Sequence, residues 1–172
     1  VGLAKKVFIG DPLAEYVNPI YAKAAAGTAI TVVEAWQATL GFTFQIYFDF
    51  SGYTDMALGL ARMLGVVADG GALDRRSVLS AGTLEQLTRE RIHGPDKVLP
   101  YTISWAAGLM RNDGLNVFGP GAAVGHYGWG GSMAMADPER GVSAAYAMTR
   151  QSPHLIGDLR PKRLLEALYA AL

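Results

Sequence analysis

The chain has 172 residues, with 15 basic and 15 acidic side chains, so its formal net charge is zero. This length is sufficient for a domain with a true hydrophobic core. Lysine and arginine form no cluster, which argues against a nucleic-acid partner. The sequence has no cysteine, and this excludes disulfides, thiolate metal sites and cysteine nucleophiles.

Charged residues are scarce in the first part of the chain. Between Ala24 and Phe48 the only one is Glu34, which makes this stretch borderline for a membrane span of about 20 apolar residues. A buried helix of a soluble protein is the alternative. The run Val7–Ile9 is too short for the apolar part of a signal peptide. The chain starts with Val1, as an excerpt from a longer protein would.

The first half of the sequence predicts mainly helices. Pro12 and Pro19 are expected to interrupt the opening, and residues 22–30 form either a loop or a weak helix. A helix is predicted over 31–47. One apolar stripe marks a further amphipathic helix, which glycines at 70–71 should end. The stripe consists of Met56, Leu60, Met63 and Val67.

The second half changes from helical to strand-like periodicity. A short helix is predicted over 79–91, with Ser80 as its N-cap. Residues 138–141 (Pro-Glu-Arg-Gly) favour a turn, and a final helix is expected from Pro161. Its sheet-facing residues are predicted to be Leu164, Leu165, Leu168 and Leu172. Antiparallel strands are predicted within 103–111, 124–131, 132–137 and 142–150.

This pattern predicts an α+β fold in which helices pack on an antiparallel sheet. An α-helical segment, of membrane or soluble origin, precedes the sheet. The four polar residues of this segment lie in otherwise apolar sequence, and in lipid they would have to line a cavity or pair. They are Asp49, Ser51, Tyr53 and Asp55. In a soluble helix-turn-helix, Ser51 and Gly52 would instead form the turn, and Asp55 would cap the next helix.

The stretch 42–65, FTFQIYFDFSGYTDMALGLARMLG, resembles the membrane-bound O-acyltransferase family, in its alginate O-acetylation branch. The resemblance implies membrane helices and acyl transfer to a polysaccharide hydroxyl. It ends before the histidine on which that chemistry depends in the family. The three histidines of this chain, His93, His126 and His154, occur in other contexts. This part is therefore not expected to transfer acyl groups by itself.

From about residue 57 onward, the chain resembles the serine β-lactamase, penicillin-binding protein and esterase superfamily. The motif HYGWGG at 126–131 takes the place of the family's K-T-G element. The resemblance implies that His126 tunes the electrostatics of the pocket and that the Trp129 amide donates to an oxyanion. It also implies substrate contacts at Tyr127, Gly128 and Gly130. The alternative interpretation is a structural histidine in a strand and a glycine-rich bulge.

Departures from this superfamily are equally informative. No serine of the chain is followed by lysine three residues later, so the nucleophile motif S-x-x-K is absent. Tyr16-Val17-Asn18 fits the spacing of the Y-x-N element, but it lies in the other family's sequence and is interpreted as coincidence. Tyr127 replaces a small hydroxyl residue that binds the substrate carboxylate in lactam and peptide enzymes. An intact relative with this feature is expected to prefer esters.

The sequence as a whole predicts two joined fragments that overlap in the shared string LARMLG. Residues 1–62 are assigned to the acyltransferase-like fragment and residues 63–172 to the hydrolase-like one. The predicted function is that of a serine hydrolase fragment that is inactive alone, because it lacks a nucleophile. Alternatives are an acyltransferase fragment or a non-catalytic remnant of a fusion. No cofactor or metal is expected, since the histidines are widely spaced.

A small-molecule ester or lactam is the partner expected for an intact relative. A membrane partner is left open for residues 1–62. The sequence does not fix the compartment, and association with a membrane, the cytoplasm and the periplasm all remain open.

Overall fold

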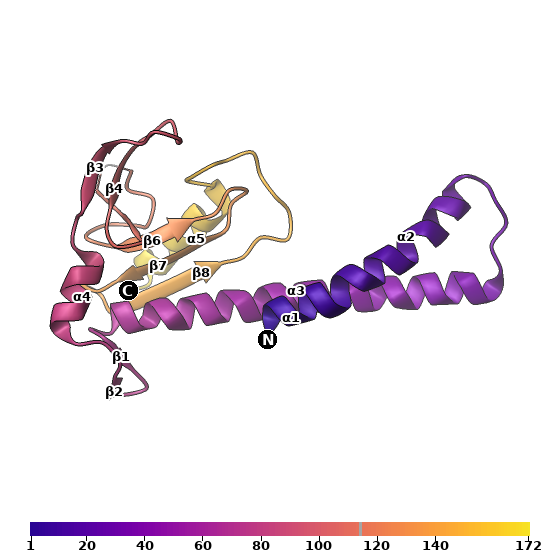
Figure 1. Ribbon diagram of the computed structural model, residues 1–172, viewed down its shortest axis with the longest axis horizontal. Helices are drawn as coiled ribbons and strands as arrows, with labels where there is room; N and C mark the ends of the chain where they lie inside the picture. The colour runs from indigo at the N-terminus through magenta and orange to yellow at the C-terminus, as the bar shows by residue number, and fades with distance from the viewer. Residues whose placement is uncertain (114) are drawn as a thin grey trace. The chain divides into compact units, whose positions relative to one another are not determined.

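The computed structural model describes residues 1–113 and 115–172 and divides them into two compact units. The first unit is Val1–Met56 and the second is Ala57–Leu172. Helix α3 (Val32–Ala68) begins in the first unit and ends in the second (Figure 1). The two units are described separately below.

The first unit is a helical hairpin. Its first arm runs through α1 (Gly2–Lys5), a π-helical turn η1 (Lys6–Gly10) and α2 (Asp11–Ala25). Pro12 lies in the first turn of α2 and Pro19 inside it, so the expected interruption is wrong. The first turn of α2, with Pro12, follows directly on η1, a π-helical turn in which the regular α-helical hydrogen-bond ladder is already altered.

The second arm of the hairpin starts at a capping box. Glu34 N–H donates to Thr31 Oγ1 at 3.1 Å, and Thr31 N–H donates to Glu34 Oε2 at 2.7 Å. This reciprocal pair satisfies two N–H groups that a helix start leaves without helical partners. It explains why the loop after α2 ends where α3 begins.

The polar residues of the second arm pair with two lysines of the first. Lys5 Nζ lies 2.9 Å from Asp55 Oδ2 and donates to Ser51 Oγ at 2.8 Å. Lys6 Nζ lies 3.2 Å from Asp49 Oδ1. Ser51 is inside the continuous helix α3, so the alternative with a turn at this position is wrong. The described contacts of Asp49, Ser51 and Asp55 are therefore with lysines of the first arm and not with one another.

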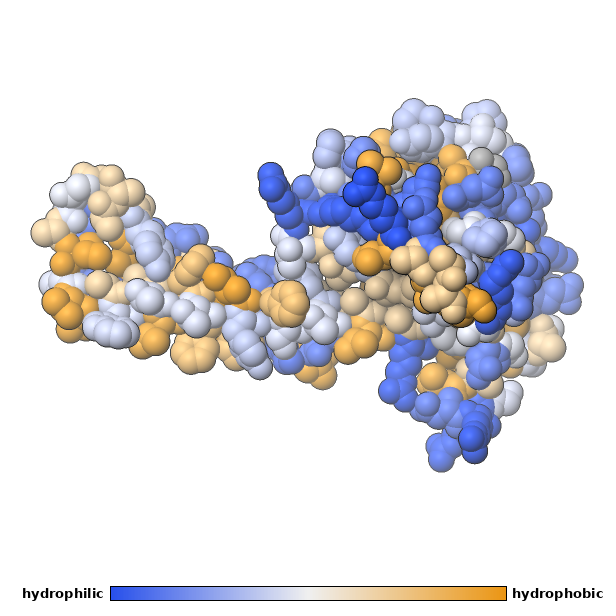
Figure 2. Space-filling view, turned by 180° about the vertical axis from the view of Figure 1, so that it is seen from behind, coloured by the Kyte–Doolittle hydropathy of each residue, from blue (hydrophilic) through white to orange (hydrophobic). Residues whose placement is uncertain are grey.

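Many large apolar side chains of the hairpin remain exposed, among them Phe8, Trp36, Phe44, Tyr47 and Phe50. Apolar colour accordingly recurs along its surface in Figure 2. None of the described helices has both the length and the hydropathy needed to cross a bilayer.

The second unit is built around a six-stranded antiparallel sheet of order β3-β4-β5-β6-β7-β8. A small two-stranded sheet and helix α4 (Ala81–Thr88) precede it, and α5 (Leu159–Ala170) follows it. The small sheet consists of β1 (Ala72–Leu73) and β2 (Arg76–Ser77). The six strands are β3 (Ile92–Pro95), β4 (Thr102–Trp105), β5 (Met110–Arg111), β6 (Val124–Tyr127), β7 (Met133–Asp137) and β8 (Val142–Tyr146).

The α+β class and several local predictions are confirmed. Ser80 caps α4 by accepting a hydrogen bond from Thr83 N–H at 3.1 Å. Residues 138–141 connect β7 to β8 as a hairpin, with Gly141 at a φ of 65°. Residues 103–111 contribute to two strands, β4 and β5, because Gly108 adopts a φ of 78° in the turn between them.

Both faces of strand β7 are covered, which is why all five of its residues are buried. Met133 and Met135 point to one face and pack with Leu165 of α5. Ala134 and Ala136 point to the other face and pack with the last two turns of α3. Alternate residues of a strand face opposite sides, so the sequence of β7 places large side chains under α5 and small ones under α3.

The predicted apolar stripes of both helices are partly wrong. The end of α3 buries Leu64, Val67 and Ala68, whereas Leu60 and Met63 are exposed. In α5 the buried leucine is Leu165, and partly buried Leu168 and Tyr169 join it. Leu164 and Leu172 are 58% and 66% exposed. The face of α5 is therefore narrower than the leucine pattern suggested.

Candidate functional site

Strand β6 places His126 at the surface of the second unit. Its side chain is exposed, and its ring lies 5.7 Å from that of Trp105, centroid to centroid. Its Nδ1 lies 2.7 Å from the Tyr127 carbonyl oxygen. A carbonyl oxygen only accepts, so the proton of the neutral ring is on Nδ1. Nε2 is then left with a free lone pair.

Tyr127 points to the opposite face of the same strand, into the core. Its ring stacks on Phe118 at 5.3 Å, and its hydroxyl donates to the Val117 carbonyl at 3.1 Å. Burial raises the pKa of Tyr127 to about 12. The expectation that the Tyr127 side chain binds substrate therefore disagrees with the structure. Neighbouring residues of a strand alternate between faces, so His126 and Tyr127 cannot line one surface together.

The glycine-rich residues after β6 form a tight turn into β7. Gly128 N–H donates to Ser132 O at 2.8 Å, and Gly131 N–H donates to Gly128 O at 3.2 Å. Gly130 N–H donates to His154 O at 3.1 Å. Gly130 and Gly131 have φ values of 98° and 111°, a region in which residues with a Cβ are strained.

The Trp129 amide differs from the other amides of this turn. No described residue accepts a hydrogen bond from Trp129 N–H, whereas the amides of Gly128, Gly130 and Gly131 all donate. The Trp129 side chain is 74% exposed. The turn therefore leaves one N–H group without an acceptor among the described residues, and it is the group that the resemblance implies as the oxyanion donor.

An ion pair between the buried Asp158 and the partly exposed Arg160 supports this turn from the side of α5. Arg160 Nη2 donates to Asp158 Oδ2 at 2.7 Å, and Arg160 Nε donates to Asp158 Oδ1 at 3.1 Å. The hydrogen bonds from Arg160 hold the pKa of the Asp158 carboxyl well below its usual range. Ser152 Oγ also donates to Asp158. The sequence did not predict this group, because the final helix was expected only from Pro161, whereas the structure begins it at Leu159 with Asp158 as its N-cap.

One serine, acid and histidine cluster lies elsewhere in the sheet, but it has the wrong order for catalysis. Ser104 Oγ donates to Glu90 Oε2 at 2.8 Å, and His93 Nδ1 lies 3.1 Å from the same oxygen. A serine nucleophile needs the histidine between itself and the acid. Here the carboxylate occupies that position, and Ser104 is fully buried. The cluster therefore joins β3, β4 and the residues before them.

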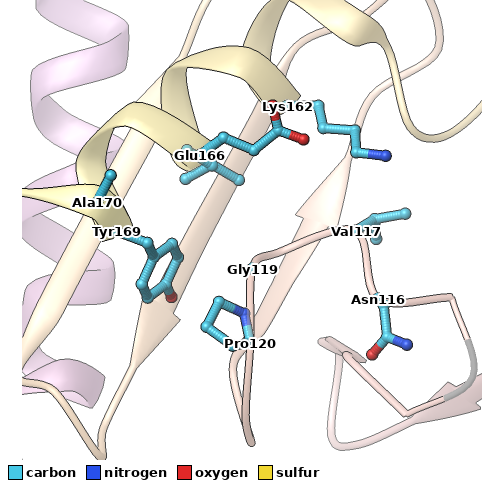
Figure 3. A pocket seen from close by; sticks show the side chains of 9 residues that line it. Asn116, Val117, Gly119, Pro120, Lys162, Glu166, Tyr169 and Ala170 are labelled. Atoms are coloured by element: carbon cyan, nitrogen blue, oxygen red, sulfur yellow. The ribbon is translucent and has the colours of Figure 1, made fainter.

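A cavity of about 410 Å³ lies between α5 and residues 116–120. In Figure 3, Lys162, Glu166 and Tyr169 come from the helix, and Asn116, Val117, Gly119 and Pro120 from the facing loop. The cavity contains none of the residues 126–131. Among residues 1–113 and 115–172, no three histidine or carboxylate side chains are grouped so as to hold a metal ion.

Comparisons with known proteins find relatives of two kinds. A stretch of 66 residues is 41% identical to the peptidoglycan O-acetyltransferase of Helicobacter pylori, covering 38% of this chain and 12% of that protein. A stretch of 64 residues is 47% identical to a probable alginate O-acetylase, AlgI, of Pseudomonas aeruginosa, covering 37% of this chain and 12% of the relative. These matches agree with the acyltransferase resemblance of the upstream sequence.

The other matches are to β-lactamase-like proteins. The esterase/beta-lactamase LipL of Mycobacterium tuberculosis is 38% identical over 104 residues, covering 59% of this chain and 24% of LipL. The crystal structure of a penicillin-binding protein homologue from Caulobacter crescentus has a TM-score of 0.65 and 55% identity. It covers 67% of this chain, which spans 32% of that one.

A family VIII carboxylesterase structure aligns with a TM-score of 0.63 and 36% identity, over 66% of this chain and 31% of its own. The chain therefore spans a third or less of each of these relatives. The family model described as Beta-lactamase matches residues 51–169, which is well over half of the sequence. By this match, and by the antiparallel sheet with helices packed on both faces, the chain belongs to the beta-lactamase family.

Proposed function

We propose that the second unit is part of a serine hydrolase that cleaves a small ester. In this proposal, the turn after β6 supplies the oxyanion donor, and His126 supplies a polar group beside it. The chain has no S-x-x-K motif, so the attacking hydroxyl and its base must come from sequence outside these residues. Covalent catalysis by serine requires such an activated hydroxyl.

The free Trp129 amide carries the proposal. An oxyanion donor must be rigidly held and must not already donate to the protein. The hydrogen bonds of the amides on either side of Trp129, and the lack of a described acceptor for its own N–H, support this role. Gly128 is only partly buried and offers backbone that a substrate can approach, whereas Gly130 is buried and its carbonyl is already bound by Ser152 and Arg160.

His126 is proposed to act through its neutral ring. Nε2 can accept a hydrogen bond from substrate or from the missing machinery, since Nδ1 faces the Tyr127 carbonyl. The buried Tyr127 leaves no small hydroxyl at this position to bind a substrate carboxylate. The missing hydroxyl supports an ester in preference to a lactam. The similarity to a carboxylesterase structure supports the same choice.

The chain alone is expected to show no turnover of 4-nitrophenyl butyrate or nitrocefin above the buffer rate, because it lacks a nucleophile.

The chain is also expected to bind phenylphosphonate, a mimic of the anionic intermediate, with a shift of the Trp129 amide resonance in a ¹H–¹⁵N spectrum. His126→Ala should weaken this binding, and His93→Ala, a change at another exposed histidine, should not. Steady hydrolysis that disappears in His126→Ala would overturn the proposed lack of a nucleophile. An unmoved Trp129 resonance would overturn the oxyanion role.

A second candidate function concerns the first unit alone. We infer that the hairpin is a fragment of an O-acyltransferase, from the 64- to 66-residue matches. Its internal lysine–carboxylate pairs and its exposed aromatic surface support this origin. In lipid-facing proteins, charged groups pair inside and apolar groups face outward. The expected partner is a membrane.

This second candidate predicts that the full chain sediments with membranes and needs detergent for extraction. Carbonate washing separates peripheral from embedded protein, and retention in the pellet is the expected result. As a matched test, Phe44→Ser combined with Phe50→Ser should shift protein to the supernatant, because both changes remove exposed apolar surface. Complete recovery of the unchanged chain in detergent-free buffer as a monomer would rule out the membrane partner.

A further inference from the structure

The carbonyl of Gly130 receives two hydrogen bonds from outside its turn. Ser152 N–H donates to it at 2.9 Å, and Arg160 Nη2 donates to it at 3.1 Å. The same guanidinium is fixed by Asp158 and donates through Nη1 to the Arg150 carbonyl at 2.7 Å. Arg160 thus joins the start of α5 to the turn after β6.

Planar peptide groups transmit this restraint to the Trp129 amide. In a trans peptide, the C=O of one residue and the N–H of the next point in opposite directions. Holding the Gly130 C=O toward Arg160 therefore points the Gly131 N–H back across the turn, where it donates to Gly128 O. Holding the Gly128 C=O inward in turn points the Trp129 N–H outward. Two successive peptide planes thus connect Arg160 to the free amide.

We propose that Arg160, clamped by Asp158, is a positioning residue that sets the direction of the Trp129 N–H. Arg160 does not itself line the proposed site, because its nitrogens are used by Asp158 and by the carbonyls of Gly130 and Arg150. The purpose of this positioning rests on the proposed function, whereas the mechanical link is independent of it.

Gly131 fits the same arrangement. A Cβ at this position would overlap both the Asp158 carboxylate and the Arg160 guanidinium. The ion pair therefore packs directly against the backbone of the turn, with no side chain between them. Close packing of this kind lets the ion pair fix the Gly130–Gly131 peptide plane, since rotation of this plane would bring it against Asp158 and Arg160.

The test compares Arg160→Ala and Arg160→Lys with Arg163→Ala in the full chain. Arg163 is an exposed residue of the same helix and serves as the matched control. Arg160→Ala should raise the hydrogen-exchange rates of the Gly130 and Gly131 amides about tenfold, by loss of a charge-assisted hydrogen bond. It should also shift the Trp129 amide resonance and weaken its response to phenylphosphonate. Arg160→Lys should have an intermediate effect, because an ammonium has three N–H donors on a single atom and cannot make all four hydrogen bonds of the guanidinium.

The amide of Met135 in β7 reports on the fold as a whole and should keep its exchange rate. If it accelerates together with the turn amides in both Arg160 variants, Arg160 only stabilises the unit and the positioning role is wrong. Unchanged exchange at Gly130 and Gly131 in both variants would also overturn it. If these amides respond while phenylphosphonate leaves Trp129 unmoved in the unchanged chain, the link stands and the proposed function fails.

Discussion

Phe118→Ala should destabilise the second unit by about 3–5 kcal/mol, the usual cost of removing a buried phenylalanine ring. Phe118 is fully buried between the sheet and α5, and its ring stacks on Tyr127. The backbone around it is held by a side chain, since Phe118 N–H donates to Asn112 Oδ1 at 3.0 Å. This anchoring limits collapse of the surrounding loop into the cavity, so the cost should lie toward the upper end.

Urea unfolding followed by tryptophan fluorescence measures this change. Val98→Ala is the matched control, because Val98 belongs to the same unit and is almost fully exposed. It should change the free energy of unfolding by less than about 0.5 kcal/mol. A loss below about 1 kcal/mol in Phe118→Ala would contradict the placement of this ring in the core.

Asp137→Ala should destabilise the same unit by about 2–4 kcal/mol, because several hydrogen bonds to a buried carboxylate are lost together. Asp137 Oδ1 accepts from the backbone N–H groups of Glu139 and Arg140 at 3.0 and 3.2 Å. Its Oδ2 accepts from Tyr169 Oη at 2.9 Å and from Arg140 Nη1 at 3.0 Å. One side chain therefore fixes both the β7–β8 turn and the end of α5.

Glu139→Ala is the control for Asp137→Ala, since Glu139 is an exposed acid of the same turn. Its loss should cost about 0–1 kcal/mol, as expected for an exposed ion pair. The two variants are compared by thermal unfolding, together with hydrogen exchange of the Arg140 amide. Equal effects of the two substitutions would show that the buried carboxylate has no special role.

Local signals explain which parts of the fold could be predicted. The Ser80 cap and the 138–141 turn depend on neighbouring residues only, and both are as expected. The helix faces depend on what packs against them, and here prediction failed. Leu164 follows the leucine pattern, but the sheet reaches α5 at Leu165 and Tyr169. Sequence periodicity does not contain that information.

In the candidate site, too, local signals were predictable and tertiary contacts were not. Motif position predicted roles for His126 and the Trp129 amide, and in the structure this amide has no described acceptor. The motif predicted Tyr127 beside His126, because the two residues are adjacent in sequence. In a strand, however, adjacent side chains point to opposite faces. Arg160 lies 30 residues from the carbonyl of Gly130 that it holds. A contact of that kind depends on tertiary structure and has no signature in the motif.

The polar residues of the first unit allowed two interpretations, one for membrane helices and one for a soluble helix-turn-helix. The helical pairing of Lys5 with Asp55 depends on a partner arm 50 residues away, which no local pattern announces. The continuous helix through Ser51 also overrides the turn tendency of a Ser-Gly pair.

The alternation of methionine and alanine along β7 restricts how this strand can change. A one-residue insertion would exchange the two faces and drive methionine side chains against α3 while leaving gaps under α5. Single substitutions that enlarge an alanine would meet the same obstacle. Substitutions in β7 that the fold tolerates should therefore preserve side-chain volume or be accompanied by a compensating substitution in a residue that packs against them. A change in the length of the strand should be as poorly tolerated as a change in its residues.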